Sequence, residues 1–196
     1  MKDEKNVELR TYMETSKPTT VPEGCAAGPG LVQVYTGNGK GKTTAALGQA
    51  LRARGRGLRV YLIQFFKMRE TGELLANKKY GLFDCYSAGR GFITGKPAEE
   101  DIRAAAEGLE RAGRILSAGK YQLVILDEIN NAVAGGLLSS ADVLAAVAGR
   151  HAGVEVILTG RDAPQEFIAA ADLVTIMESA KHPLDEGIGA REGIEY

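Results

Sequence analysis

Glycines and lysines alternate in one short stretch that follows an apolar run. The residues able to contact an anion there are Gly37, Asn38, Gly39, Lys40, Gly41, Lys42, Thr43 and Thr44. Glycines let backbone N–H groups approach a phosphate closely, and a lysine at the start of a helix adds positive charge. The Thr43 hydroxyl is a suitable ligand for a divalent cation. These residue types predict a triphosphate site for ATP with Mg²⁺ (or Mn²⁺).

The stretch departs from the common phosphate-binding loop (P-loop) at one position. The pattern G-x-x-x-x-G-K-[ST] places a glycine where this chain has Thr36, so the first turn of the loop is expected to differ. The alternatives are an ordinary strand-to-helix turn and a dinucleotide fingerprint. The fingerprint is disfavoured because Lys42 takes its third glycine position and the strand end at residues 59–64 carries no carboxylate for a ribose.

Two carboxylates, Asp127 and Glu128, follow a second apolar run at residues 121–126. The carboxyl ends of parallel strands are where such sheets bind ligands. We expect Asp127 to bind the metal opposite Thr43, and Glu128 to bind the metal or to position a water or a substrate hydroxyl. Lys42 and Glu128 are the catalytic candidates. An acid-rich turn at the strand end is the alternative.

Three further side chains are weaker candidates. Arg161 follows another apolar run and is a candidate for the nucleotide or for the other substrate. Arg52, after the loop, is a candidate for the phosphates of the nucleotide; each arginine could equally be a solvated surface residue. His182 lies in a loop before a glycine-rich tail, where a catalytic role is the less favoured interpretation.

The elements that must position these residues alternate between short apolar runs and helical stretches. This alternation is typical of βα units around a parallel sheet. It resembles the three-layer P-loop NTPase (RecA-like) fold, an α/β class with a mostly parallel central sheet of about six strands. The expected strands are Leu31 to Tyr35, Val60 to Phe65, Phe83 to Tyr86, Leu123 to Leu126, Val154 to Leu158 and Leu173 to Met177.

Capping and helix-breaking residues also predict where three of the helices begin or end. Pro97 and the acids after it indicate one helix start, and Gly119 indicates its end. Ser139 is expected to cap a helix that ends near residue 149. Asp162, with a glutamine three residues later, resembles a capping box for the next helix.

The bulk composition limits the function classes. The chain has 196 residues, 44% of them hydrophobic, and a formal net charge of -1, which favours one domain and no nucleic-acid partner. Two distant cysteines, no membrane-length apolar run and no secretory leader predict a cytoplasmic protein that binds no membrane. Residues 1–28 are expected to be a flexible arm, or one that folds over the site, before a nucleotide-binding domain at 29–196.

Five segments in one order resemble the P-loop family of ATP:corrinoid adenosyltransferases. They are the loop at 35–44, the strand end at 124–128, Leu158-Thr-Gly-Arg161, Lys181-His-Pro183 and the tail Ala190-Arg-Glu-Gly-Ile-Glu-Tyr196. The resemblance covers about residue 30 to the end of the sequence. It implies transfer of the 5'-deoxyadenosyl group of ATP to the Co(I) of a reduced corrinoid, with release of triphosphate.

The resemblance also implies a homodimer, a reductant protein such as a flavodoxin or a flavin reductase, and a nucleotide that lies in the direction opposite to other P-loop enzymes. It implies aromatic residues beneath the corrin, in a Gly-Phe-Thr-Trp-like stretch. Here the stretch is Gly91-Phe92-Ile93-Thr94, so Phe92 is the corrinoid candidate, and the chain has no tryptophan.

The residues alone leave two other functions open. A carboxylate pair after a buried strand also suits a RecA-like ATPase that couples hydrolysis to a conformational change. A nucleotide-gated binding protein without catalysis is the third hypothesis. Neither the preferred corrinoid nor the electron donor follows from the sequence.

Overall fold

Six short strands form one sheet in which every pairing within the described residues is parallel. The computed structural model describes residues 28–66, 71–89, 91 and 95–195. The sheet order is β3-β2-β4-β5-β1-β6. The strands are β1 (Val32–Thr36), β2 (Val60–Gln64), β3 (Asp84–Ser87), β4 (Leu123–Asp127), β5 (Glu155–Thr159) and β6 (Leu173–Ile176). All six expected strands are confirmed, with their bounds shifted by no more than a residue or so.

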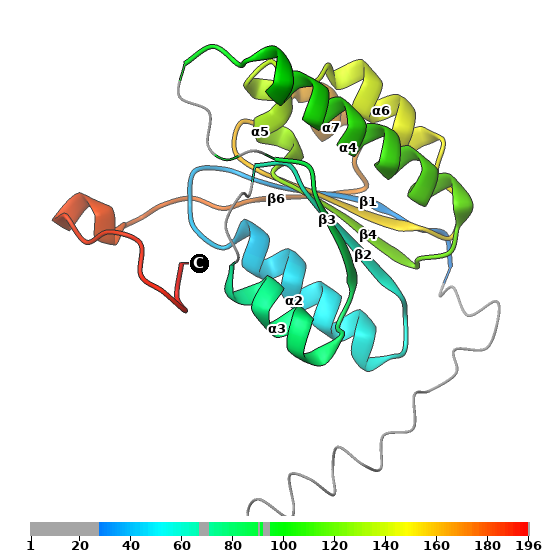
Figure 1. Cartoon of the computed structure of the whole chain (residues 1–196), viewed down its shortest axis with the longest axis horizontal. Helices are drawn as coiled ribbons and strands as arrows, with labels where there is room; N and C mark the ends of the chain where they lie inside the picture. The colour runs from blue at the N-terminus through cyan, green and yellow to red at the C-terminus, as the bar shows by residue number, and fades with distance from the viewer. Residues whose placement is uncertain (1–27, 67–70, 90, 92–94, 196) are drawn as a thin grey trace, which may run out of the picture.

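The helices cover both faces of this sheet, which gives three layers (Figure 1). On one face lie α2 (Lys42–Gly55) and α3 (Gly72–Tyr80). On the other lie α4 (Glu99–Ala118), α5 (Ile129–Ala134), α6 (Ser140–Ala148) and α7 (Gln165–Ala170). A 3-10 turn, η1 (Pro183–Glu186), follows β6 outside the layers. The expected α/β class with a RecA-like arrangement is confirmed.

The central strands are buried on both faces because each face has its own apolar core. Along β2, Leu62 packs with the small alanines of α2, while Tyr61 and Ile63 pack toward the larger core under α4 and α6. Ala46, Ala50 and Ala53 are the buried residues of α2, so this helix lies close to the strands. The small side chains thereby fix the position of the loop that leads into α2.

The expected ends of α4 and α6 are confirmed. Gly119 ends α4 in the left-handed conformation, with φ 63°. The Ser139 side chain accepts a hydrogen bond from the backbone N–H of Asp142 and so caps α6. The sequence pattern predicted neither α3 nor α5; α3 has no buried residue, so no apolar stripe marks it in the sequence.

The capping role expected of Asp162 is wrong. Pro164 precedes α7, and its carbonyl accepts the first helical hydrogen bonds, from Phe167 and Ile168. Asp162 instead adopts a left-handed backbone, with φ 52°. The turn before α7 is therefore two residues longer than a capping box would make it.

Within the described residues, no helix is both long and apolar enough to cross a membrane. The arm expected at residues 1–28 falls almost wholly outside the described residues. Phe92, with Ile93 and Thr94, lies outside them as well.

Candidate nucleotide site

The P-loop joins the end of β1 to the start of α2 and is packed against the backbone that follows β6. Gly37 has φ 97°, and a Cβ there would lie 2.3 Å from the Met177 carbonyl oxygen. A Cβ on Gly39 would lie 2.7 Å from the backbone of Glu178. The Gly39 N–H donates to the Met177 carbonyl at 2.7 Å. Only glycine fits at these two positions, because another part of the main chain occupies the space.

Lys42 begins α2 and turns back over the loop. Its Nζ donates to the carbonyl oxygens of Gly37 and Gly39, both at 2.7 Å. Burial lowers the pKa of Lys42, the positive charge of Arg161 lowers it further, and Glu128 and Asp162 oppose the shift. The two hydrogen bonds hold the Lys42 amine beside the carboxyl edge of the sheet, where these charged groups meet.

Asp127 is fully buried at the end of β4 and lies directly beside the loop. Its Oδ1 accepts from the hydroxyls of Thr43, at 2.8 Å, and Thr159, at 2.7 Å. Its Oδ2 accepts from the Gln64 side-chain amide at 3.2 Å. These contacts join the ends of β2, β4 and β5 to the first turn of α2, so the carboxylate is held rigidly in front of Thr43.

The Thr43 hydroxyl and the Asp127 carboxylate are hard oxygen donors, which is the donor set that Mg²⁺ prefers. Their 2.8 Å contact places both on one side of the loop, where the phosphates would supply the remaining oxygens. No cluster of three or more His, Cys, Asp or Glu side chains with metal-site geometry occurs among the residues described. The residues present fit a cation bound jointly with phosphate, the usual arrangement for Mg²⁺.

A cavity of about 350 Å³ opens beside Glu128. Glu128 and Asp162 both line it, and they are the non-glycine residues with positive φ in the described chain, at 65° and 52°. Such backbone strain concentrates at functional sites because the surrounding structure must maintain it. Phe66 and Leu137 add apolar walls, and Asn131 adds an amide. The cavity combines carboxylates with apolar surface, as ligand pockets do.

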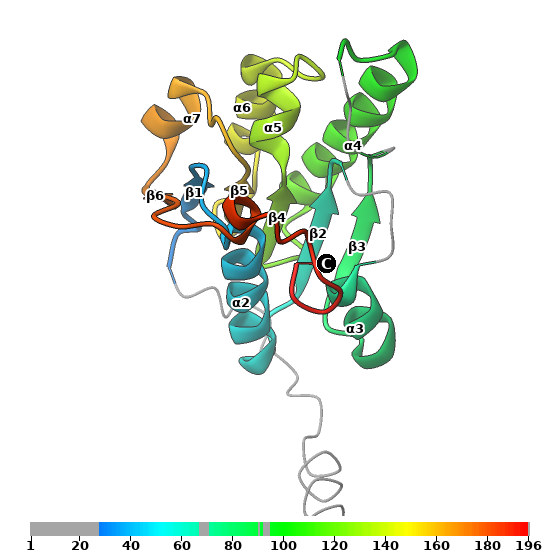
Figure 2. The same cartoon turned by 90° about the vertical axis from the view of Figure 1, so that its left-hand side faces the viewer.

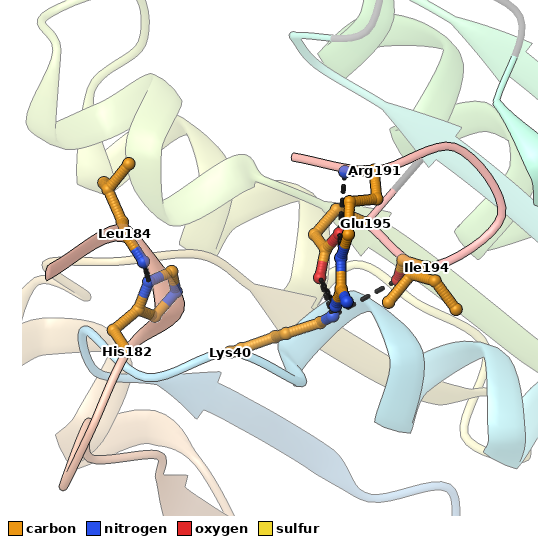
Figure 3. A network of polar contacts seen from close by, with 6 residues as sticks. All are labelled: Lys40, His182, Leu184, Arg191, Ile194 and Glu195. Carbon is orange, nitrogen blue, oxygen red and sulfur yellow. Dashed lines mark hydrogen bonds and ion pairs between the residues drawn. The ribbon is translucent and has the colours of Figure 1, made fainter. Parts of the chain in front are cut away.

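The segment after β6 returns to the outer side of the loop (Figure 2). The Asn38 side chain accepts from the Ser179 N–H at 3.2 Å. Further along, Lys40 Nζ donates to a Glu195 oxygen at 2.8 Å and to the Ile194 carbonyl at 3.2 Å (Figure 3). His182 stays apart from this contact, since its Nδ1 accepts from the Leu184 N–H. A local capping role accounts for His182 without catalysis.

The remaining sequence candidates lie at different distances from the loop. Arg161 is exposed, but its charge acts on Lys42, and its backbone N–H donates to Asn131 Oδ1 at 3.0 Å. Arg52 is ten residues after Lys42 on the same helix, roughly 15 Å along its axis, and donates to Gln49. Thr44 is exposed in the first turn of α2. The structure therefore brings Arg161 to the site and does not bring Arg52 there.

Sequence reasoning missed several side chains that build the site. Thr159 and Gln64 hold Asp127, and each is the last residue of its strand, which was the available signal. Asn131 and Asp162 line the cavity with no pattern to mark them. Glu195 lay inside a recognised tail motif, but nothing in the sequence connected it to Lys40.

A glycine loop on a parallel sheet, with a lysine and a threonine set against a buried strand-end aspartate, defines a P-loop nucleotide-binding protein. A solved KaiC-like protein from Pyrococcus horikoshii has a similar fold, with a TM-score of 0.50 at 19% identity over 79% of this chain and 75% of that one. This likeness concerns the fold alone.

The particular family follows from the sequence comparisons. The model described as ATP:corrinoid adenosyltransferase BtuR/CobO/CobP matches residues 29–196. Proteins named corrinoid adenosyltransferase from Pseudomonas aeruginosa and Escherichia coli K12 are each 37% identical over 85% of this chain, covering 84% and 86% of their own lengths. The chain belongs to the ATP:corrinoid adenosyltransferase family, and it is a transferase whose family substrates are ATP and a corrinoid.

Proposed function

We propose that this chain transfers the 5'-deoxyadenosyl group of ATP to the Co(I) of a reduced corrinoid and releases triphosphate. The cobalt electron pair forms the bond to the ribose C5' carbon, and the C5'–O bond breaks with its electrons leaving on the triphosphate. The corrinoid supplies the nucleophile, so the protein's task is to orient the reactants and stabilise the leaving group. The observation that carries the proposal is the preformed cation Lys42, held over the loop beside the pair Thr43 and Asp127.

The triphosphate is the group that gains negative charge when the C5'–O bond breaks. Lys42 can exchange its two loop carbonyls for phosphate oxygens without moving far, so its charge is in place before the reaction. Thr43 and Asp127 would hold Mg²⁺, which neutralises further phosphate charge when bound. The buried contacts of Asp127 with Gln64 and Thr159 keep this pair from reorganising during the reaction.

The cavity beside Glu128 supports the proposal that the nucleoside end of ATP lies on that side of the loop. Its volume, about 350 Å³, is at the small end of ligand pockets and suits a nucleoside better than a whole corrin macrocycle. Glu128, held by its backbone N–H on Thr159, would accept a hydrogen bond from a ribose hydroxyl. C5' would then be presented at the cavity mouth, in the reversed orientation that the family resemblance implies.

Product analysis tests the reaction directly. Protein, ATP, Mg²⁺ and chemically reduced corrinoid should give a light-sensitive cobalt–carbon product and intact inorganic triphosphate. ADP and phosphate formed at the same rate without corrinoid would instead identify a RecA-like ATPase. Nucleotide binding without any turnover would identify a gated binding protein.

Phe92 is proposed to contact the corrin face, on the basis of the family resemblance alone. Phe92→Ala should then reduce activity more with enzymatically reduced Co(II) corrinoid than with prereduced Co(I), because the aromatic ring would help to expel the lower axial ligand. Equal losses with both forms would argue against that role. Gly91 precedes it with φ 114°, a backbone that favours glycine.

We also propose a cytoplasmic homodimer that receives its electron from a flavodoxin or a flavin reductase. The edge strand β6 exposes Leu173, at 42%, and Ile176, at 62%, which supports a partner surface. Light scattering on the purified chain tests the dimer, and a mass equal to the 20.8 kDa chain would exclude it.

A further inference from the structure

Both lysines of the P-loop donate hydrogen bonds to oxygen atoms of the protein, and the acceptors of the two lysines differ in charge. Lys42 donates to two neutral carbonyls inside the loop. Lys40 donates to the Glu195 carboxylate at 2.8 Å and to the Ile194 carbonyl at 3.2 Å. These acceptors use donors that a phosphate would need, so a triphosphate that binds Lys40 must compete with a negative charge from the chain itself.

Glu195 is held in this position by Arg191, which lies one helical turn before it. The Arg191 Nη2 and Nε atoms donate to the two carboxylate oxygens at 3.1 and 3.2 Å, and its backbone N–H donates at 2.7 Å (Figure 3). The Arg191 carbonyl accepts from the N–H groups of Ile194 and Glu195, which closes the turn. Hydrogen bonds from Arg191 and Lys40 lower the pKa of Glu195 to about 2. The carboxylate is thus a preformed anion throughout the neutral range.

We propose that Glu195 gates the triphosphate site: its carboxylate holds Lys40 while the loop is empty, and an incoming triphosphate displaces it. The inference rests on the proposed function, because it requires a triphosphate on this loop. Binding of the triphosphate and closure of the tail then oppose each other, and the coupling is reciprocal. After the reaction, the return of Glu195 to Lys40 would favour release of the triphosphate product.

The size of the effect follows from the exposure of the pair. The Lys40 side chain is 48% exposed and that of Glu195 is 22% exposed, so solvent and salt weaken their attraction. A triphosphate carries several charges against the single charge of Glu195, so it wins the competition. We expect removal of the carboxylate charge to tighten triphosphate binding by roughly two- to five-fold at low salt.

The decisive experiment measures binding of inorganic tripolyphosphate and of ATP with Mg²⁺ by calorimetry. Glu195→Gln should bind both ligands more tightly than the unaltered chain, and the gain should shrink as salt is added. Glu192→Gln is the matched control, because it removes one exposed charge from the same tail. Equal or weaker binding by Glu195→Gln would overturn the gate. Absence of binding to the unaltered chain would overturn the proposed function as well.

A second background separates the gate from a general field effect. In Lys40→Met, the Glu195→Gln change should no longer alter affinity, because the contact through which it acts is gone. If the gain persists there, the carboxylate acts at long range and the gate is wrong.

Displacement of the tail can be observed independently of affinity. The chain contains no tryptophan, so Ile194→Trp introduces a single indole, which can be excited selectively over the tyrosines, at a side chain that is 59% exposed. Its emission should change as tripolyphosphate binds, with the midpoint that calorimetry gives. Unchanged emission at saturation would show that the tail stays in place and would contradict displacement.

Discussion

The two lysines of the P-loop are held by very different parts of the molecule. Lys42 is half-buried, and the carbonyls that it contacts lie three and five residues before it. Lys40 is exposed and is held by residues 154 and 155 positions later in the chain. Lys42 thus has an inner position, which is fixed by contacts within the loop. Lys40 has an outer position, which is fixed by contacts with the tail.

This difference suggests that the inner and outer sides of the loop have different functional roles. The inner side adjoins the buried network of Asp127, Thr43 and Thr159, which cannot rearrange without exposing buried polar groups. The outer side adjoins an exposed turn whose release exposes little new surface. We therefore expect changes on the inner side to affect catalysis and changes on the outer side to affect affinity.

The largest effect is expected from Lys42→Ala on the inner side. Loss of the preorganised charge should lower kcat/KM for ATP by roughly 10² to 10³-fold while the fold is retained. Lys120→Ala is the matched control, since Lys120 is exposed at the opposite edge of the sheet, just before β4. Steady-state kinetics and circular dichroism measure the two quantities. A kcat/KM close to that of the control would refute the assignment of Lys42.

Asp127→Asn should separate the metal role of this residue from its structural role. The asparagine oxygen can keep both threonine hydrogen bonds. A half-turn of the Gln64 amide would give up its 3.3 Å hydrogen bond to Glu73 and present its oxygen, which has no partner among the described residues, to the new amide. Activity should fall by about ten-fold or more, with a higher Mg²⁺ requirement, because a neutral amide is a poorer ligand.

The same variant should keep its melting temperature within a few degrees, since the buried hydrogen bonds survive. Asp127→Leu is the contrast: it leaves buried hydroxyls unpaired and should lower stability by about 1–3 kcal/mol. If Asp127→Asn unfolds as readily as Asp127→Leu, the charge itself holds the network together.

Gly37→Ala should damage the place where the tail segment meets the loop. The new Cβ would lie 2.3 Å from the Met177 carbonyl oxygen, at a φ of 97° that side chains rarely adopt. We expect a loss of about 1–3 kcal/mol in the free energy of unfolding, together with weaker ATP binding. Gly48→Ala, in the open face of α2, should instead gain about 0.5–1 kcal/mol. Equal effects would mean that the close approach of residue 177 is not important.

The smallest effect concerns pH. The pKa of Lys42 is lowered, first by burial and then by Arg161, and only the protonated amine attracts phosphate. As the pH rises through this lowered pKa, kcat/KM for ATP should therefore fall. The fall should begin at a lower pH than it would for an ordinary lysine, whose pKa is about 10.4. Lys42→Arg stays charged and should lose this alkaline limb, at reduced activity. An unchanged limb in Lys42→Arg would assign the titration to another group.

The inner side of the loop could be predicted from the sequence because its determinants are local or periodic. Apolar runs located all six strands, and the strand ends placed Thr43 and Asp127 at one edge before any contact was known. Thr159 and Gln64 were missed because a polar residue at a strand end does not reveal its partner.

The outer side could not be predicted, because its contacts join distant parts of the chain. The pair of Lys40 and Glu195 spans 155 residues, and no periodicity connects them. Asp162 was misjudged because Pro164, two residues later, determines where α7 begins. Phe92 remains a prediction.

The position of β1 in the sheet has a consequence for how the site forms. Within the part of the chain that the structure describes, the strand that carries the loop pairs with β5 and β6, at registers such as Val32 with Val156 and Gln33 with Leu173. Most of the described chain must therefore exist before β1 has a partner, and such long-range parallel pairing is slow. The loop is synthesised before β5 and β6 and becomes ordered only with them, so cellular ATP, by binding only the finished site, would stabilise the last step of folding.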